Sequence, residues 1–407
     1  MRRLRKSFVN ILLRAHPVPY TLASTMLFSL RSHGSAVTAL TTTTKGLVLG
    51  DRDGVTIIWN LQLRRPLVRW AAHKDMVVTI LEWEEYLVTH GKDGEIAVWA
   101  FANQDQTPKL VVSIPVNSLN FCNIVLSGTY LFTPATMDLN NFDVYKINKE
   151  GKGLNRVITN YSGCKLVEKD PSQGREWGVI MSMRYINETL TLCLCYESGD
   201  VIAIDINFDR KEEAPVVEVG NAVPDTTNKP SGLSGLFAKS KPEKVIERTV
   251  INKDPKLTLR YHNTQHRPEP ITASTWDIQR GRLLTGSATD TMLVHDIYHT
   301  CADVVTLQHQ GVQAIVSTEG HVILAHWNGQ VSIREDTLPY LEVKSFSRPV
   351  PGDRVYDPNT GKLTPLIKLS SMAVIDVPSK RRHEAGRMTA VMCGYDDGVI
   401  TAFAVSS

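Results

Sequence analysis

The chain has 407 residues, of which 42% are hydrophobic, and a formal net charge of +3. This near-neutral charge argues against direct nucleic-acid binding and against docking on an anionic membrane. The sequence contains no run of 18 apolar residues, so we predict no membrane-spanning segment. The six cysteines lack the spacing of metal ligands or of a disulfide framework, so we expect reduced thiols in a protein of the cytosol or nucleus.

The first 17 residues are basic and contain no acidic side chain. Apolar residues between positions 8 and 13 could form one face of a helix, as in a mitochondrial transit peptide. A short disordered basic tail explains the same composition. We interpret residues 1–17 as such a tail and residues 18–407 as one folded domain.

One pattern repeats along that domain: a short apolar strand, a tight polar turn, and an alternating strand that ends on a large residue. The copies at 47–59 and 87–99 align residue for residue, with Trp59 and Trp99 at their ends. Each has Asp-Gly in the turn, which supplies the positive φ of a type I′ hairpin. Five weaker copies end on Tyr145, Asp205, His295, Arg334 and Phe403.

Seven such units predict an all-β fold, a seven-bladed β-propeller. A single four-stranded sheet cannot bury both faces, whereas seven sheets stacked radially can. Only four residues follow Phe403, so the last unit lacks its outer strand. We expect the apolar run at 20–30 to supply that strand and close the ring, which joins the two ends of the chain.

Residues 207–268 interrupt the repeat, and we place this insertion between blades four and five. Its charge and its Pro, Gly and Ser content are typical of a flexible segment. A partner-binding loop is the alternative, because Leu233, Leu236 and Phe237 form an apolar cluster in a polar setting. Loops are also expected at 347–365 and 380–387.

Motifs for catalysis and cofactor binding were sought and not found. The Gly232–Gly235 segment has the wrong spacing for a nucleophile elbow. His262 and His266 are four residues apart, but Pro268 breaks any helix that could align them on a metal. We therefore predict a protein that is not an enzyme and has no cofactor or metal.

Five residues are candidates for partner binding. Arg64, Arg65 and Pro66 form either a docking patch or a solvated turn before an edge strand. Trp70 is either an exposed anchor or a packed residue of an outer strand. Trp327 lies in a turn motif, where tryptophan is unusual, and could contact a partner from the propeller face.

The repeats resemble WD40 repeats. His33 and His73 stand where that family places a histidine that hydrogen-bonds within the blade, although the Trp-Asp dipeptide has become Trp59-Asn60 and Trp99-Ala100. A series of fragments in order resembles one family more closely, the ASTRA-associated protein 1 family, whose animal counterpart is named G-protein-β-subunit-like protein 1. These fragments are 30–40, 59–66, 70–73, 90–93, 116–122, 196–199 and 325–329.

The resemblance implies a scaffold in the nucleus and cytoplasm. The family works with the TTT co-chaperone complex of helical-repeat proteins, which supports maturation of phosphatidylinositol-3-kinase-like kinases. It is also grouped with RuvB-like AAA+ ATPases in the ASTRA assembly, which is tied to chromatin regulation. Two alternatives stay open: a WD40 substrate receptor or other signalling adaptor, and a propeller hydrolase.

Overall fold

The computed structural model describes residues 26–405 except for 103–106, 118, 120, 149–152, 168–176, 209–211, 219–245, 253–254, 349–366 and 379–386. The tail at 1–17 and the cluster of Leu233, Leu236 and Phe237 lie outside the described residues. None of the helices in the described part of the chain is long and apolar enough to cross a membrane.

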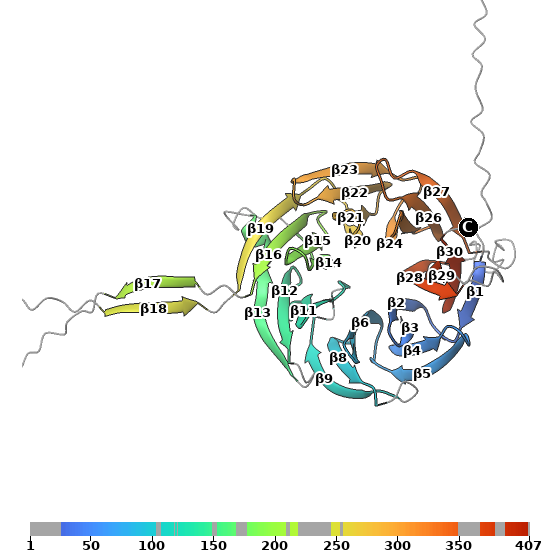
Figure 1. Cartoon of the computed structure of the whole chain (residues 1–407), viewed down its shortest axis with the longest axis horizontal. Helices are drawn as coiled ribbons and strands as arrows, with labels where there is room; N and C mark the ends of the chain where they lie inside the picture. The colour runs from blue at the N-terminus through green and yellow to red at the C-terminus, as the bar shows by residue number, and fades with distance from the viewer. Residues whose placement is uncertain are drawn as a thin grey trace, which may run out of the picture.

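Strands of the described residues form seven four-stranded antiparallel sheets, which stand around a central channel as propeller blades (Figure 1). Blade one has β2 (Val37–Thr43), β3 (Gly46–Asp51), β4 (Val55–Asn60) and β5 (Arg65–Ala71). Blade two has β6 (Val77–Trp83), β7 (Tyr86–Gly91), β8 (Glu95–Ala100) and β9 (Lys109–Pro115). Blade three has β10 (Val125–Ser127), β11 (Tyr130–Pro134), β12 (Asn141–Ile147) and β13 (Leu154–Ser162), followed by the short 3-10 helix η1 (Gly163–Leu166).

The remaining blades continue around the ring. Blade four has β14 (Ile180–Ile186), β15 (Thr191–Tyr196), β16 (Val201–Asn207) and β19 (Lys256–Asn263). Blade five has β20 (Ile271–Asp277), β21 (Arg282–Ser287), β22 (Thr291–Asp296) and β23 (Cys301–Thr306). Blade six has β24 (Val312–Thr318), β25 (His321–His326), β26 (Gln330–Glu335) and β27 (Glu342–Ser347). Blade seven has β28 (Leu369–Pro378), β29 (Arg387–Tyr395), β30 (Val399–Ala404) and β1 (Met26–Arg31). The predicted seven-bladed all-β fold is confirmed.

The turn glycines are required by the backbone path. Gly54 has a φ of +80°, and a Cβ added there would lie 2.1 Å from the carbonyl oxygen of His73. Gly94 occupies the same position in blade two, with a φ of +85°. A residue with a side chain would be strained at both places, which explains the Asp-Gly turns of the repeat.

The core lies between neighbouring blades rather than within any one of them. Leu47 and Trp59 of blade one pack in one cluster with Met392 and Ile400 of blade seven. Comparable clusters join blades three and four, and blades six and seven. Each blade thus depends on its neighbours for burial of its apolar faces.

Ring closure occurs as predicted from the sequence. β1 pairs antiparallel with β30, in a register that runs from Met26 opposite Phe403 to Arg31 opposite Val399. The described part of the closing strand is Met26–Arg31, and residues 20–25 of the predicted run lie outside the described residues. Both ends of the described chain therefore lie in blade seven.

The predicted place of the insertion is wrong in one respect. β19 lies within 207–268, yet it pairs with β16 as the outer strand of blade four, from Val201 opposite Asn263 to Asn207 opposite Lys256. The excursion therefore interrupts blade four before its last strand. β17 (Glu212–Glu218) and β18 (Ile246–Asn252) belong to the excursion and pair with each other in a separate two-stranded sheet.

Candidate interaction surface

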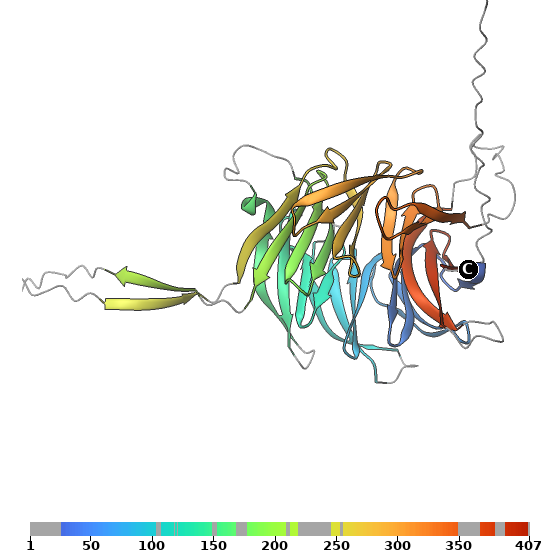
Figure 2. The ribbon, with the colours of Figure 1, turned by 45° about the horizontal axis from the view of Figure 1, so that its top comes forward.

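Each blade carries two sets of connections at opposite ends of its antiparallel strands. Turns between the first and second strands, and between the third and fourth, lie on one side of the ring, which we call the lower face. Turns between the second and third strands, and the links from blade to blade, lie on the upper face. Figure 2 shows the depth of the ring between these faces.

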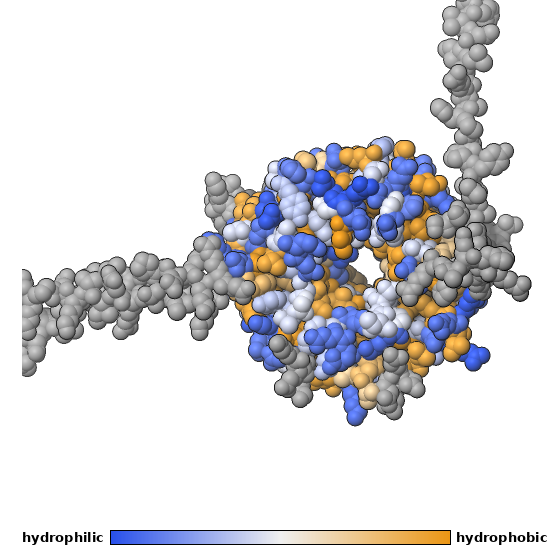
Figure 3. All heavy atoms as spheres, in the orientation of Figure 1, coloured by the Kyte–Doolittle hydropathy of each residue, from blue (hydrophilic) through white to orange (hydrophobic). Residues whose placement is uncertain are grey.

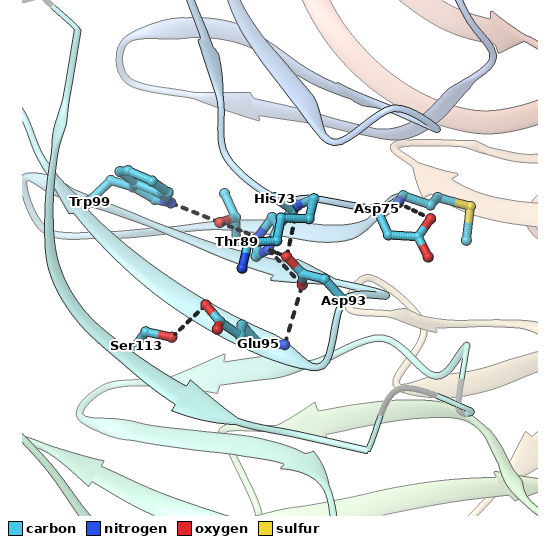
Figure 4. A network of polar contacts seen from close by, with 9 residues as sticks. His73, Asp75, Thr89, Asp93, Glu95, Trp99 and Ser113 are labelled. Atoms are coloured by element: carbon cyan, nitrogen blue, oxygen red, sulfur yellow. Dashed lines mark hydrogen bonds and ion pairs between the residues drawn. The ribbon is translucent and has the colours of Figure 1, made fainter.

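A chain of hydrogen bonds crosses blade two (Figure 4). Trp99 Nε1 donates to Thr89 Oγ1 at 2.8 Å, and this oxygen lies 2.8 Å from His73 Nε2. Because the hydroxyl accepts from Trp99, we assign its proton to the bond with His73. His73 Nδ1 then donates to the Asp93 carboxylate at 3.0 Å. The ring is neutral in this arrangement, which agrees with the lowering of the His73 pKa by burial against the opposing effect of Asp93.

Blade one keeps only part of this network. His33 Nδ1 lies 2.7 Å from the Asp51 carboxylate. Leu49 occupies the position that Thr89 has in blade two, so the hydroxyl is missing. His33 Nε2 and Trp59 Nε1 are consequently buried without a hydrogen-bond partner.

Blade five rebuilds the network with a histidine in place of the tryptophan. His295 Nε2 lies 2.7 Å from Thr285 Oγ1, which lies 2.8 Å from His266 Nε2. The Tyr261 hydroxyl lies 2.9 Å from His295 Nδ1 and can fix its tautomer. Burial lowers the pKa of His295 to about 3 and that of His266 to about 4, so both rings are neutral near pH 7.

An ion-pair cluster occupies the upper part of blade four. The buried Asp200 carboxylate accepts from Arg267 Nε at 2.6 Å, from Ser198 Oγ at 2.5 Å, and contacts His262 Nε2 at 2.8 Å. Burial alone would raise the pKa of Asp200, but these hydrogen bonds outweigh it and lower the pKa. His262 and His266 are thus engaged with different partners, and they do not face one metal position.

The titratable groups of these networks therefore stabilise the fold. Arg334, at the position of the terminal tryptophan in blade six, donates to the Tyr340 carbonyl at 2.9 Å and to Glu342 at 3.2 Å. Within the described residues, no cluster of three His, Cys, Asp or Glu side chains could hold a metal ion.

The sequence-predicted site residues do not come together. Arg64, Arg65 and Pro66 are exposed on blade one, and the Arg64 guanidinium stacks 4.6 Å from the Phe28 ring of β1. Trp70 is only 6% exposed and packs edge-on against Trp99. Of the two alternatives for Trp70, the structure supports the packed residue of the outer strand, because the inter-blade core covers it.

Trp327 lies far from that segment, in the β25–β26 turn on the upper face. It is 45% exposed and borders a cavity of about 300 Å³ together with Gln313, Lys368 and Leu369. Gly311 makes room for its ring, since a Cβ there would lie 2.3 Å from it. A partner-binding role for Trp327, Arg64, Arg65 and Pro66 stays a prediction.

Exposed apolar side chains gather on the lower face of blades five and six. We define the blade 5–6 patch by Ile278, Tyr298, Leu338 and Leu341, which are 72%, 40%, 59% and 58% exposed. They come from three connections: the first and last turns of blade five and the last turn of blade six. Exposed apolar clusters rimmed by charge are typical of protein-interaction surfaces.

Ion pairs tie these turns together. Arg280 donates to Asp336 at 2.9 Å, which links the first turn of blade five to the last turn of blade six. Arg282 pairs with Asp296 at 2.9 Å within blade five, and His299 lies 2.7 Å from the same carboxylate. These ion pairs hold the turns in place and put charged side chains at the rim of the patch. Sequence reasoning missed it, because its members come from turns far apart in the chain.

These features define a class of protein: a WD40-type β-propeller whose described polar network is structural and whose exposed apolar residues lie on its loops. Comparison with solved structures agrees, since Saccharomyces cerevisiae Sqt1 superposes with a TM-score of 0.58 at 12% identity, over 95% of this chain and all of that one. Figure 3 shows the open centre of the ring with polar and apolar residues mixed around it.

The family model of ASTRA-associated protein 1 matches residues 26–403, and the chain belongs to that family. The Scheffersomyces stipitis protein of that name is 33% identical over 331 residues, which cover 75% of each chain. The Candida tropicalis protein is 29% identical and covers 93% of this chain and 99% of its own.

Proposed function

We propose that this chain is a non-catalytic scaffold subunit of the ASTRA assembly. Membership of a family whose relatives are named ASTRA-associated proteins is the observation that carries the proposal. Its partners would be the helical-repeat subunits of the TTT co-chaperone complex, together with RuvB-like AAA+ ATPases and a phosphatidylinositol-3-kinase-like kinase. It would support maturation of those kinases and chromatin regulation, in the nucleus and cytoplasm.

The blade 5–6 patch is the surface we assign to the helical-repeat partner. Helical-repeat proteins bind their partners through extended surfaces built from rows of helices. The patch offers Ile278, Leu338 and Leu341 for apolar contacts with such a surface, and both signs of charge at its rim. Tyr298 adds an aromatic anchor of the kind enriched in binding hot spots.

The first test is affinity purification of the tagged chain from its native cells, followed by mass spectrometry. Stoichiometric recovery of helical-repeat co-chaperone subunits would support the proposal. Recovery of ubiquitin-ligase subunits instead, or of no partner, would overturn it.

The second test addresses the surface. The double substitution Ile278→Glu, Leu341→Glu should abolish recovery of the partner, because it buries two charges in an apolar interface. Leu63→Glu is the matched control, since Leu63 is 67% exposed on the lower face of blade one. Both variants should unfold at the wild-type temperature. Equal recovery from the double variant and the control would refute the assignment of this patch.

A further inference from the structure

The central channel contains a cavity of about 440 Å³, lined by residues from five of the seven blades. Most of its lining is apolar or hydroxyl-bearing, with Thr38, Thr79 and Ser371 from blades one, two and seven. Asn123 contributes an amide between blades two and three. Arg184, on the innermost strand of blade four, is the one charged side chain among the described residues that line it.

Arg184 is held in place by neutral groups. Its Nη1 donates to the Met183 carbonyl at 2.9 Å, and its Nη2 donates to the Ser274 carbonyl of blade five. These bonds span two blades and fix the guanidinium at the channel wall. In the part of the chain that the structure describes, no carboxylate forms an ion pair with it.

The groups that interact electrostatically with Arg184 are thiols. They are Cys122, Cys193 and Cys195, and all three are buried. Burial raises their pKa values, that of Cys195 to about 12, so they are neutral at physiological pH. The arginine charge therefore has no protein counter-charge among its described neighbours, although burial favours neutralisation of such a charge.

From this geometry we infer that the channel binds one small oxoanion, a phosphate group, against Arg184. A guanidinium presents a planar fork of N–H donors that matches two oxygens of a phosphate. Thr38 and Asn123 of the cavity wall already donate to the Val77 and Met183 carbonyls. The Thr79 hydroxyl accepts from the Ile124 N–H and can donate its own proton to one of the remaining oxygens. Low-dielectric channel walls strengthen the attraction relative to open solvent.

The cavity accepts either free phosphate or a phosphate carried by a small metabolite, because its volume exceeds that of the anion alone. Such a ligand would contact several blades at once. By contacting these blades together, the ligand would raise the free energy of unfolding of the propeller by mass action.

Isothermal titration calorimetry and thermal unfolding test this inference on the full chain, with inorganic phosphate and glycerol 3-phosphate as probes and chloride at equal ionic strength as reference. We expect saturable one-to-one binding and a rise in the unfolding temperature. The stronger of the two probes identifies free or carried phosphate. Phosphate also stabilises folded proteins by exclusion from their surface, so comparison with variants decides the result.

Arg184→Met should weaken binding at least tenfold, whereas Arg52→Met, at an exposed arginine that does not line the cavity, should leave it unchanged. Arg184→Lys keeps the charge and should retain part of the affinity, which provides a folded variant if the methionine protein unfolds. A wild-type protein that shows no saturable binding of either probe would overturn the inference. Binding that is unaffected in both Arg184 variants would overturn it as well.

Discussion

Thr89→Val isolates the hydroxyl at the centre of the blade-two network. Valine has the shape of threonine but removes Oγ1, the shared partner of Trp99 Nε1 and His73 Nε2 at 2.8 Å each. Each buried group left without a partner costs about 1–3 kcal/mol. We therefore expect a loss of about 2–6 kcal/mol in the free energy of unfolding, measured by urea denaturation with tryptophan fluorescence.

Thr89→Ser is the control, because it keeps the hydroxyl and loses one methyl group, which costs about 1 kcal/mol. Blade one supplies the reverse experiment. Leu49→Thr places a hydroxyl beside His33 Nε2 and Trp59 Nε1, both of which lack a hydrogen-bond partner. Leu49→Val is the comparison, because valine has the same volume as threonine but no hydroxyl. The threonine variant should be the more stable of the two by about 2 kcal/mol or more, opposite to the usual order in an apolar core. If Thr89→Val matched Thr89→Ser, or if Leu49→Val were the more stable variant, the reasoning would be refuted.

Three further predictions concern the same fold. His90 is fully buried, and neither ring nitrogen has a partner, so His90→Leu should raise the urea midpoint by the equivalent of about 1–3 kcal/mol; a lower midpoint would contradict this. Burial lowers the pKa of His90 and His295 to about 3, and of His266 and His326 to about 4. Below the ordinary pKa of 6.5 these histidines are protonated in the unfolded chain but stay neutral in the folded protein. The free energy of unfolding should therefore be at its full value above pH 6.5 and should fall toward pH 4, by about 2 kcal/mol per ring at pH 5. Urea midpoints that do not change between pH 7.5 and 5 would refute this prediction. Deletion of residues 1–31 removes β1 and exposes β30, and size-exclusion chromatography should then show aggregation; a monomer of wild-type stability would show that closure contributes little.

The sequence predicted the repeats because each blade buries the same positions. Trp59 and Trp99 lie one residue before the ends of the third strands of blades one and two, and the Asp-Gly turns need the positive φ that the structure shows at Gly54 and Gly94. The strand that closes blade seven could be placed because only one apolar run had no blade to join. These features are local, so one stretch of sequence is enough to reveal them.

Other features depend on contacts between distant segments. β19 carries no turn motif, so nothing in residues 256–263 indicated which end of the insertion holds the outer strand. The residues of the blade 5–6 patch come from turns of two different blades. No sequence motif distinguishes Arg184, and its place in a cavity lined by five blades follows only from the fold. Trp70 could be packed or exposed, and only the neighbouring Trp99 decides.

The pairing of β1 with β30 joins the first described strand of the chain to the last. During synthesis β1 leaves the ribosome early, yet its partner follows only after nearly all the other blades. At about 5–20 residues per second the wait is roughly 20–75 s. Throughout that time an unpaired strand edge is available to neighbouring chains. A nascent protein of this design must be shielded at its own N-terminal segment until its last residues emerge.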